Sequence, residues 1–181
     1  MIKKNLSSII NKLLFIGIFI PQFIGASEKN EKTGDILQIV IPTIGLGSTI
    51  FYEKELKGTK QFFKSLITTA LITKSLKIAT RKQRPNGECC QSFPSGHTSV
   101  AFMGAAFIHK RYGWKYSIPS YVGATFVGYS RVQVDKHFVE DVIAGAAVGI
   151  FSSFYFTKPY KGFIIDITVT NGYKIYLSQT L

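Results

Sequence analysis

The chain has 181 residues, and 22 Lys and Arg against 10 Asp and Glu give it a formal net charge of +12. This length favours a single domain. Excess positive charge is compatible with nucleic acid, an anionic membrane or phosphorylated small molecules as partners. No Lys/Arg run of the nucleic-acid-binding type occurs, so we expect no nucleic acid partner, and the cations lie instead at the ends of apolar blocks.

The N-terminus has the pattern of a bacterial secretory signal. Three lysines precede an apolar stretch of about a dozen residues, which is short for a membrane span, and Ala26 offers a small residue for cleavage. We expect residues 1–26 to be a signal peptide, with an uncleaved N-terminal anchor as the alternative. Residues 27–33 are then expected to be a polar linker.

Residues 34–161 are expected to form an all-α bundle of about five helices. None of the apolar blocks alternates like a strand, and recurring Gly, Ala and Ser allow close helix packing. The blocks are near or below the roughly 20 residues of a span, but three alternate loops carry Lys and Arg, which is the positive-inside pattern. We expect a transmembrane bundle, with a soluble periplasmic domain as the alternative. The expected helices cover 34–52, 59–82, 95–110, 116–131 and 137–157.

A β-hairpin is expected in the tail, residues 162–181. The stretch "FIIDITVTNGYKIYLS" alternates with period two and contains Asn-Gly, a strong turn signal. A register that places Ile167 opposite Ile175 gives one clean apolar face and puts Gly172 in a left-handed conformation. An isolated hairpin is marginal in water, so we expect it to pack on another surface.

The chain contains only two cysteines, Cys89 and Cys90. Because they are adjacent, a disulfide between them cannot link distant segments. We expect them to be a feature of a loop and not a metal site.

Three cations are spaced i, i+4 and i+7 near the end of the second helix. Lys77, Arg81 and Arg84 would share one helix face if the helix persisted that far. Cations also interact favourably with a helix C-terminus, so this face alone indicates no function.

The third helix begins with a possible anion site. Ser95 is a natural N-cap, and the free N–H groups of a helix N-terminus, Gly96 included, bind anions. His97 follows in the first turn. A plain capping turn explains this segment equally well when it is taken alone.

His137 and Asp141 are four residues apart, and on a helix they would share a face. A carboxylate at that spacing can orient an imidazole, as in an activated nucleophile or base, although a solvent-facing pair has the same spacing. A metal site is disfavoured here because cations surround the pair. Lys77, Arg84 and Arg131 indicate an anion, above all phosphate.

The three segments together resemble the three-part signature of the type 2 phosphatidic acid phosphatase (PAP2) superfamily, to which the vanadium haloperoxidases are also similar. Its parts are complete and in order, although the loop between the first two has only eight residues, which argues against an elaborate substrate cap. The matching parts are Lys77-x6-Arg84-Pro85, Pro94-Ser95-Gly96-His97 and Ser130-Arg131-x5-His137-x3-Asp141.

The resemblance implies a role for each residue. His137 would be a nucleophile that forms a phosphohistidine, Asp141 would orient it, and His97 would be the general acid. No metal or other cofactor is implied. The residues implied to bind the phosphoryl oxygens are Lys77, Arg84, Arg131, Ser95 and Gly96.

We therefore expect a metal-independent phosphatase at the periplasmic face of the bacterial inner membrane. The candidate substrates are phosphatidate, phosphatidylglycerol phosphate, lipid A and undecaprenyl pyrophosphate. The alternatives are a soluble periplasmic acid phosphatase of broad specificity, a vanadium-dependent haloperoxidase and a non-catalytic membrane scaffold. No feature of the sequence indicates an oligomeric state.

Overall fold

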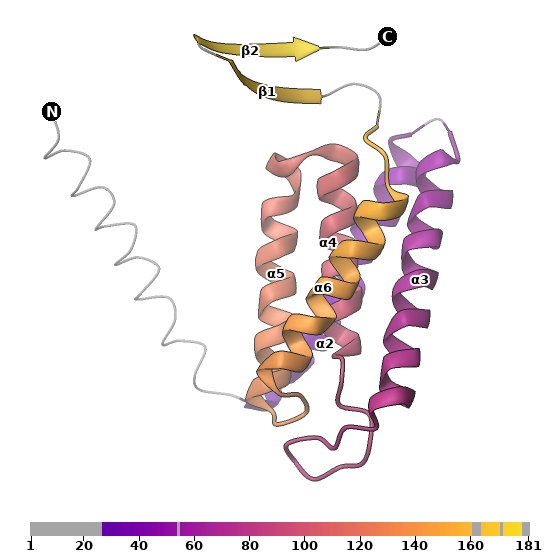
Figure 1. The fold of residues 1–181 in the computed structure, drawn as a ribbon, viewed down its shortest axis with the longest axis vertical. Coiled ribbons are helices and arrows are strands. Elements are labelled where there is room, and N and C mark those ends of the chain that lie inside the picture. The colour runs from indigo at the N-terminus through magenta and orange to yellow at the C-terminus, as the bar shows by residue number, and fades with distance from the viewer. Residues whose placement is uncertain (1–26, 54, 161–163, 171, 179–181) are drawn as a thin grey trace, which may run out of the picture.

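The computed structural model describes residues 27–53, 55–160, 164–170 and 172–178. These residues form five helices followed by two strands (Figure 1). The expected signal peptide lies outside them. The elements are α2 (Ser27–Phe51), α3 (Lys57–Thr80), α4 (Gly96–Tyr112), α5 (Trp114–Gln133), α6 (Val139–Phe156), β1 (Ile164–Thr170) and β2 (Gly172–Ser178).

Helix α4 is the centre of the bundle, since it packs against α2, α3, α5 and α6 (Figure 1). Its sequence suits that place because small side chains leave room for neighbours on all sides. Ala101, Ala105 and Ala106 are fully buried. Larger side chains fill the gap toward α3, where the rings of Phe62 and Phe107 meet edge to face at 5.1 Å between centroids.

Two glycines let α6 lie directly on the backbone of α4. A Cβ atom at Gly145 would stand 2.5 Å from the carbonyl oxygen of Ser95, and one at Gly149 would stand 2.2 Å from that of Ser99. No larger residue fits there without moving a helix. This contact fixes the start of α6 against the start of α4, where the motif residues lie.

Polarity is inverted relative to a water-soluble bundle. Large apolar side chains point outward, including Ile39 (63% exposed), Leu71 (63%) and Ile143 (64%). Small polar side chains occupy the interior, where serines and threonines bond to helix carbonyls, as Ser153 Oγ does to the carbonyl of Met103 at 2.7 Å. The buried polar residues include Ser65, Thr69, Thr73, Ser99, Ser117, Ser152 and Ser153.

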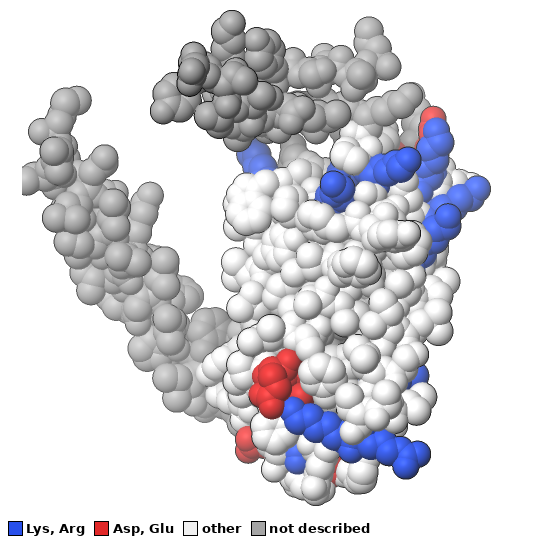
Figure 2. Space-filling view, viewed as in Figure 1, with Lys and Arg blue, Asp and Glu red and all other residues white. Residues whose placement is uncertain are grey.

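Charge is separated to the two ends of the bundle. Figure 2 shows a broad uncharged band between charged groups at either end of the visible face. Among the described residues, two helical segments are long and apolar enough to cross a membrane, Glu28–Phe51 and Val139–Phe156. These features agree with the expected membrane bundle.

Three of the differences from the expected boundaries affect the site. The segment 27–33, expected as a linker, is helical, because Glu28 lies in the favourable first turn and pairs with Lys32 at 2.7 Å. Helix α3 ends at Thr80 instead of residue 82, and α6 begins at Val139 instead of residue 137. The first shift moves Arg81 out of α3, and the second moves His137 out of α6 and into the preceding loop.

Strands β1 and β2 pair antiparallel in the tail. Ile167 lies opposite Ile175, and Val169 lies opposite Tyr173. The left-handed conformation of Gly172 and the packing of the apolar face stay predictions.

Candidate active site

The carboxylate of Asp141 is the most heavily bonded group of the site. It is fully buried. Ser92 Oγ donates to Oδ2 at 2.5 Å, Lys82 Nζ donates to Oδ1 at 2.7 Å, and the N–H of Phe138 donates to Oδ2 at 3.1 Å. The last bond caps the first turn of α6, where a carboxylate is favoured. Asp141 is thus held from three directions.

His137 lies in the loop before α6 and not on the helix face expected from the sequence. Its side chain is buried, and its backbone N–H donates to the backbone carbonyl of Arg131 at 3.2 Å. Nδ1 stands 3.8 Å from Asp141 Oδ2 and forms no hydrogen bond with any described residue. Burial first, and then the positive charges of Lys77 and Arg84, lower the pKa of His137 to about 4. The imidazole is therefore neutral at pH 7, with an unpaired ring nitrogen.

The expected three-cation face is divided by the end of α3. Lys77 is still helical and donates to the carbonyl of Gln91 at 2.5 Å. Arg81 takes a left-handed conformation with φ of 45° and is exposed. Arg84 lies in the following loop, half-buried, and pairs with Glu88 at 2.6 Å. Lys77 and Arg84 thus flank His137, and the helix face itself does not extend to Arg84.

Ser95 caps α4, as expected, but its hydroxyl is not open to a ligand. It is fully buried and lies 2.9 Å from the hydroxyl of Thr98. Its N–H donates to the carbonyl of Asp141 at 2.8 Å, which joins the starts of α4 and α6. A Cβ atom at Gly96 would lie 3.9 Å from Lys77 Cε. The start of α4 therefore faces Lys77.

His97 and Arg131 share a partner that sequence reasoning missed. Asp35 Oδ1 of α2 lies 3.2 Å from His97 Nε2 and 3.0 Å from Arg131 Nη1. Arg131 is almost fully buried, and its Nη2 donates to the carbonyl of Glu31 at 2.7 Å. Helix α2, which carries no motif, thus closes one side of the site.

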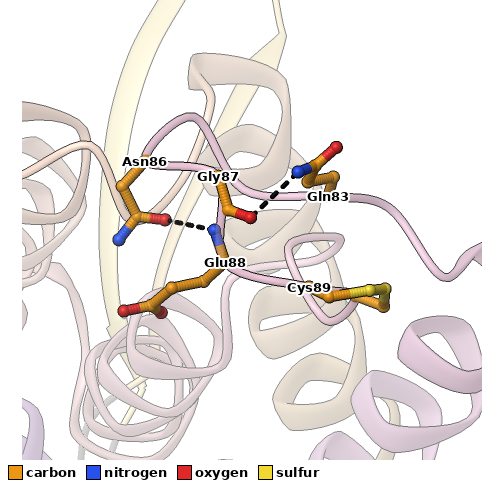
Figure 3. Close-up of a disulfide and its surroundings, with 6 residues drawn as sticks. Gln83, Asn86, Gly87, Glu88 and Cys89 are labelled. Atoms are coloured by element: carbon orange, nitrogen blue, oxygen red, sulfur yellow. Dashed lines mark hydrogen bonds between the residues drawn. A yellow bond between two sulfur atoms is a disulfide. The ribbon is translucent and has the colours of Figure 1, made fainter.

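The loop after α3 is tied to the rest of the site by backbone bonds. The N–H of Asn86 donates to the carbonyl of Asp135, and the N–H of Ser92 donates to that of Lys82. Figure 3 shows the turn inside this loop, with the sulfur atoms of Cys89 and Cys90 within bonding distance beyond it. The loop holds Lys82 and Ser92 against Asp141.

Two imidazoles and three cations therefore gather at one end of the bundle. This arrangement can bind an anion and can carry out acid–base or nucleophilic chemistry on it. Among the described residues, no three His, Cys, Asp or Glu side chains are grouped as a metal site would need. Lys82, Ser92 and Asp35 were missed because none is a fixed position of a motif. The only sequence signal for Lys82 was its basic side chain at a variable position of the first motif, between Lys77 and Arg84.

The family model of the PAP2 superfamily matches residues 59–163. A lipid A 1-phosphatase of Porphyromonas gingivalis is 34% identical over 139 residues, which are 71% of this chain and 31% of that protein. A lipid A 4'-phosphatase of Helicobacter pylori is 28% identical over 72% of this chain and 71% of its own length. The chain thus spans about a third of the first relative and most of the second.

Two solved structures are similar in fold. The transmembrane PAP2 type phosphatidylglycerolphosphate phosphatase of Bacillus subtilis matches with a TM-score of 0.57 and 29% identity, over 75% of each chain. Aquifex aeolicus LpxE matches with a TM-score of 0.53 and 23% identity, over 67% of this chain and 83% of its own. The second match bears on the fold alone.

Proposed function

Because the chain belongs to the PAP2 superfamily, a class of phosphatases, we propose that it hydrolyses a phosphomonoester or pyrophosphate of a lipid without a metal ion. The observation that carries this proposal is the convergence of His97 and His137 with three cations. The candidate substrates are phosphatidate, phosphatidylglycerol phosphate, lipid A and undecaprenyl pyrophosphate. Relatives named for lipid A phosphatase activity favour a phosphate on lipid A.

His137 is the nucleophile in this proposal. Its low pKa leaves the ring neutral at pH 7, so a nitrogen lone pair is free to attack phosphorus. The phosphohistidine that forms carries new positive charge on the ring. Asp141 Oδ2, 3.8 Å from Nδ1, is placed to stabilise that charge.

His97 is the general acid. As the bond between phosphorus and the ester oxygen breaks, the proton of His97 passes to that oxygen. The neutral imidazole then takes a proton from the water that attacks the phosphohistidine, and both groups return to their starting state.

The phosphoryl oxygens are bound by the flanking cations. Lys77 and Arg84 approach from the side of His137, and Arg131 approaches from the side of His97. The N–H of Gly96 lies at the positive end of α4. The hydroxyl of Ser95, which is buried against Thr98, serves to cap α4 and is withdrawn from the proposed cradle.

The bundle is embedded in the inner membrane, with the site at the periplasmic face. Its apolar side chains face outward as lipid requires, and the basic loops lie at the end away from the site. Residues 34–161 are the catalytic domain in this proposal, and α2 adds residues 27–33 to it. An amphiphilic substrate keeps its tail in the bilayer while its phosphate reaches His137.

Phosphate release from purified full-length protein in detergent tests this function. The panel contains the four lipid phosphates, and the variants are His137→Gln and an exposed control, Lys29→Gln. We expect at least one lipid to release phosphate with the wild type and the control, and a loss of at least about a thousandfold in His137→Gln. No release from any lipid by the wild type, or equal release by His137→Gln, would contradict the proposal.

A further inference from the structure

Asp35 places a carboxylate between His97 and Arg131. Its Oδ1 lies 3.2 Å from His97 Nε2 and 3.0 Å from Arg131 Nη1. This oxygen is buried and accepts no hydrogen bond from the described residues. The Asp35 side chain is 45% exposed, so its carboxylate stays in contact with solvent while Oδ1 brings negative charge between two groups of the site.

The fold brings Asp35 to this position through its neighbour Gly34. A Cβ atom at Gly34 would stand 2.2 Å from Ser130 Oγ and 2.9 Å from Arg131 Nη2. Only a glycine lets α2 approach α5 so closely. Helix α2 lies outside residues 59–163, so the family pattern does not account for Asp35.

The charge around His97 explains what Asp35 contributes. Arg131 of α5, Lys136 of the next loop and Lys77 of α3 all place positive charge near the imidazole. Burial first, and then these cations, lower the pKa of His97, although a general acid must be protonated. Asp35 supplies the opposing negative charge, whereas the carboxylate of the nearby Glu31 is bonded to Lys136.

This inference rests on the proposed phosphatase function. We propose that Asp35 is a positioning residue for His97, which holds its ring beside Arg131 and stabilises the imidazolium that protonates the leaving oxygen. The proton passes from His97 to the ester oxygen as the P–O bond breaks. After the attacking water returns a proton to His97, the ion pair with Asp35 forms again.

Leaving-group dependence separates this role from a structural one. Asp35→Asn is compared with wild type and with Glu28→Gln, which removes an exposed carboxylate from the same helix. With a short-chain phosphatidate, whose alkoxide must be protonated, we expect kcat to fall about tenfold in Asp35→Asn. With 4-nitrophenyl phosphate, which needs no acid, kcat should stay within about twofold. Glu28→Gln should match wild type on both substrates.

Equal losses of kcat on the two substrates would show that Asp35 supports the fold or the phosphate clamp, and would overturn the proposal. No loss on either substrate would overturn it as well. If the wild type hydrolyses neither of these two substrates, a measurement without turnover decides on Asp35.

That measurement is an NMR titration of protein with isotope-labelled histidine. The chain has three histidines, and His97→Gln identifies the signal of His97. We expect its midpoint in Asp35→Asn to fall by about one pH unit relative to wild type and Glu28→Gln. An unchanged midpoint would show that Asp35 does not stabilise the imidazolium.

Discussion

At the scale of single residues, the site combines a carboxylate that accepts three hydrogen bonds with an imidazole whose Nδ1 has no hydrogen-bond partner among the described residues. Asp141 accepts from Ser92, Lys82 and the N–H of Phe138, whereas Nδ1 of His137 accepts from none of the described residues. The carboxylate is therefore rigid, and the imidazole is free to change its charge. A nucleophile that becomes cationic needs such a fixed partner.

The low pKa of His137 gives a pH prediction. The nucleophile must be neutral, so kcat/KM should fall as pH drops through about 4. Because the charge of Lys77 helps to lower this pKa, the acid limb should move to higher pH in Lys77→Met. Lys29→Gln, at an exposed position, should leave the acid limb of the pH profile unchanged. An acid limb near pH 6.5 in the wild type would contradict the buried, neutral state of His137.

Lys82 gives a second prediction. Its ammonium group bonds to Asp141 and to Glu140, and lies 4.3 Å from the ring centroid of Phe138. Lys82→Met removes the cation and leaves the buried carboxylate of Asp141 with two donors, so kcat should fall about tenfold. Lys82→Arg keeps a cation there and should retain most of the wild-type kcat. Steady-state kinetics on the purified variants measure this. A kcat for Lys82→Met equal to that of wild type would remove Lys82 from the site.

The site residues within the motifs could be predicted from the sequence, but the residues that surround them in the site could not. His97, His137, Asp141 and Arg131 come from segments whose order and spacing are characteristic, and these segments do converge. Asp35 lies some sixty positions before His97 and in no motif, so only the approach of α2 to α5 brings it there.

At the scale of elements, the contact of α4 with α6 holds the two halves of the site together. The Ser95 N–H to Asp141 carbonyl bond exists only because Gly145 lets α6 touch α4. Gly149 repeats the contact one turn later. The geometry of the site is therefore set by backbone approach as much as by side chains.

Gly145→Ala tests that dependence. Its Cβ would stand 2.5 Å from the Ser95 carbonyl oxygen, so α6 must shift, at a cost of roughly 1–3 kcal/mol. Gly47→Ala in α2 is the matched control, because a Cβ there meets nothing within 4 Å and alanine favours a helix. We expect a lower Tm and a lower kcat in Gly145→Ala only. Equal Tm values for the two variants would contradict the close contact.

Helix positions were predictable from apolar blocks, but helix ends were not. No Gly or Pro marks residue 81, where Arg81 nevertheless adopts a left-handed conformation and ends α3. His137 and Asp141 have helical spacing, yet Asp141 caps the helix that His137 precedes. Local hydrogen bonds decide such boundaries, and a spacing pattern does not contain them.

At the scale of the whole molecule, membership in the PAP2 superfamily, predicted from three motifs, is confirmed. The all-helical bundle is confirmed too, and its inverted polarity explains why the apolar blocks looked weak. Interior positions of each helix carry serine and threonine, so mean hydropathy falls although the outer surface is apolar. The signal peptide and the packing of the hairpin stay predictions.

Carbonate extraction tests whether the helical bundle is embedded in the membrane. It is applied to membranes from cells that produce the full chain. The exposed apolar side chains need lipid, so we expect the protein to remain in the membrane pellet at alkaline pH. A secreted soluble protein without membrane spans serves as the control and should be released. Release of this chain into the supernatant would favour the soluble periplasmic phosphatase.

Capture of the covalent intermediate is the sharpest test of whether His137 is the nucleophile. Radioactive 4-nitrophenyl phosphate, whose leaving group needs no acid, is mixed rapidly with the wild type, with His97→Gln, which slows hydrolysis of the intermediate, and with His137→Gln. The account predicts an acid-labile, alkali-stable label on His137 that accumulates in His97→Gln and is absent from His137→Gln. Turnover by the wild type with no label on His137, or a label on another residue, would contradict it.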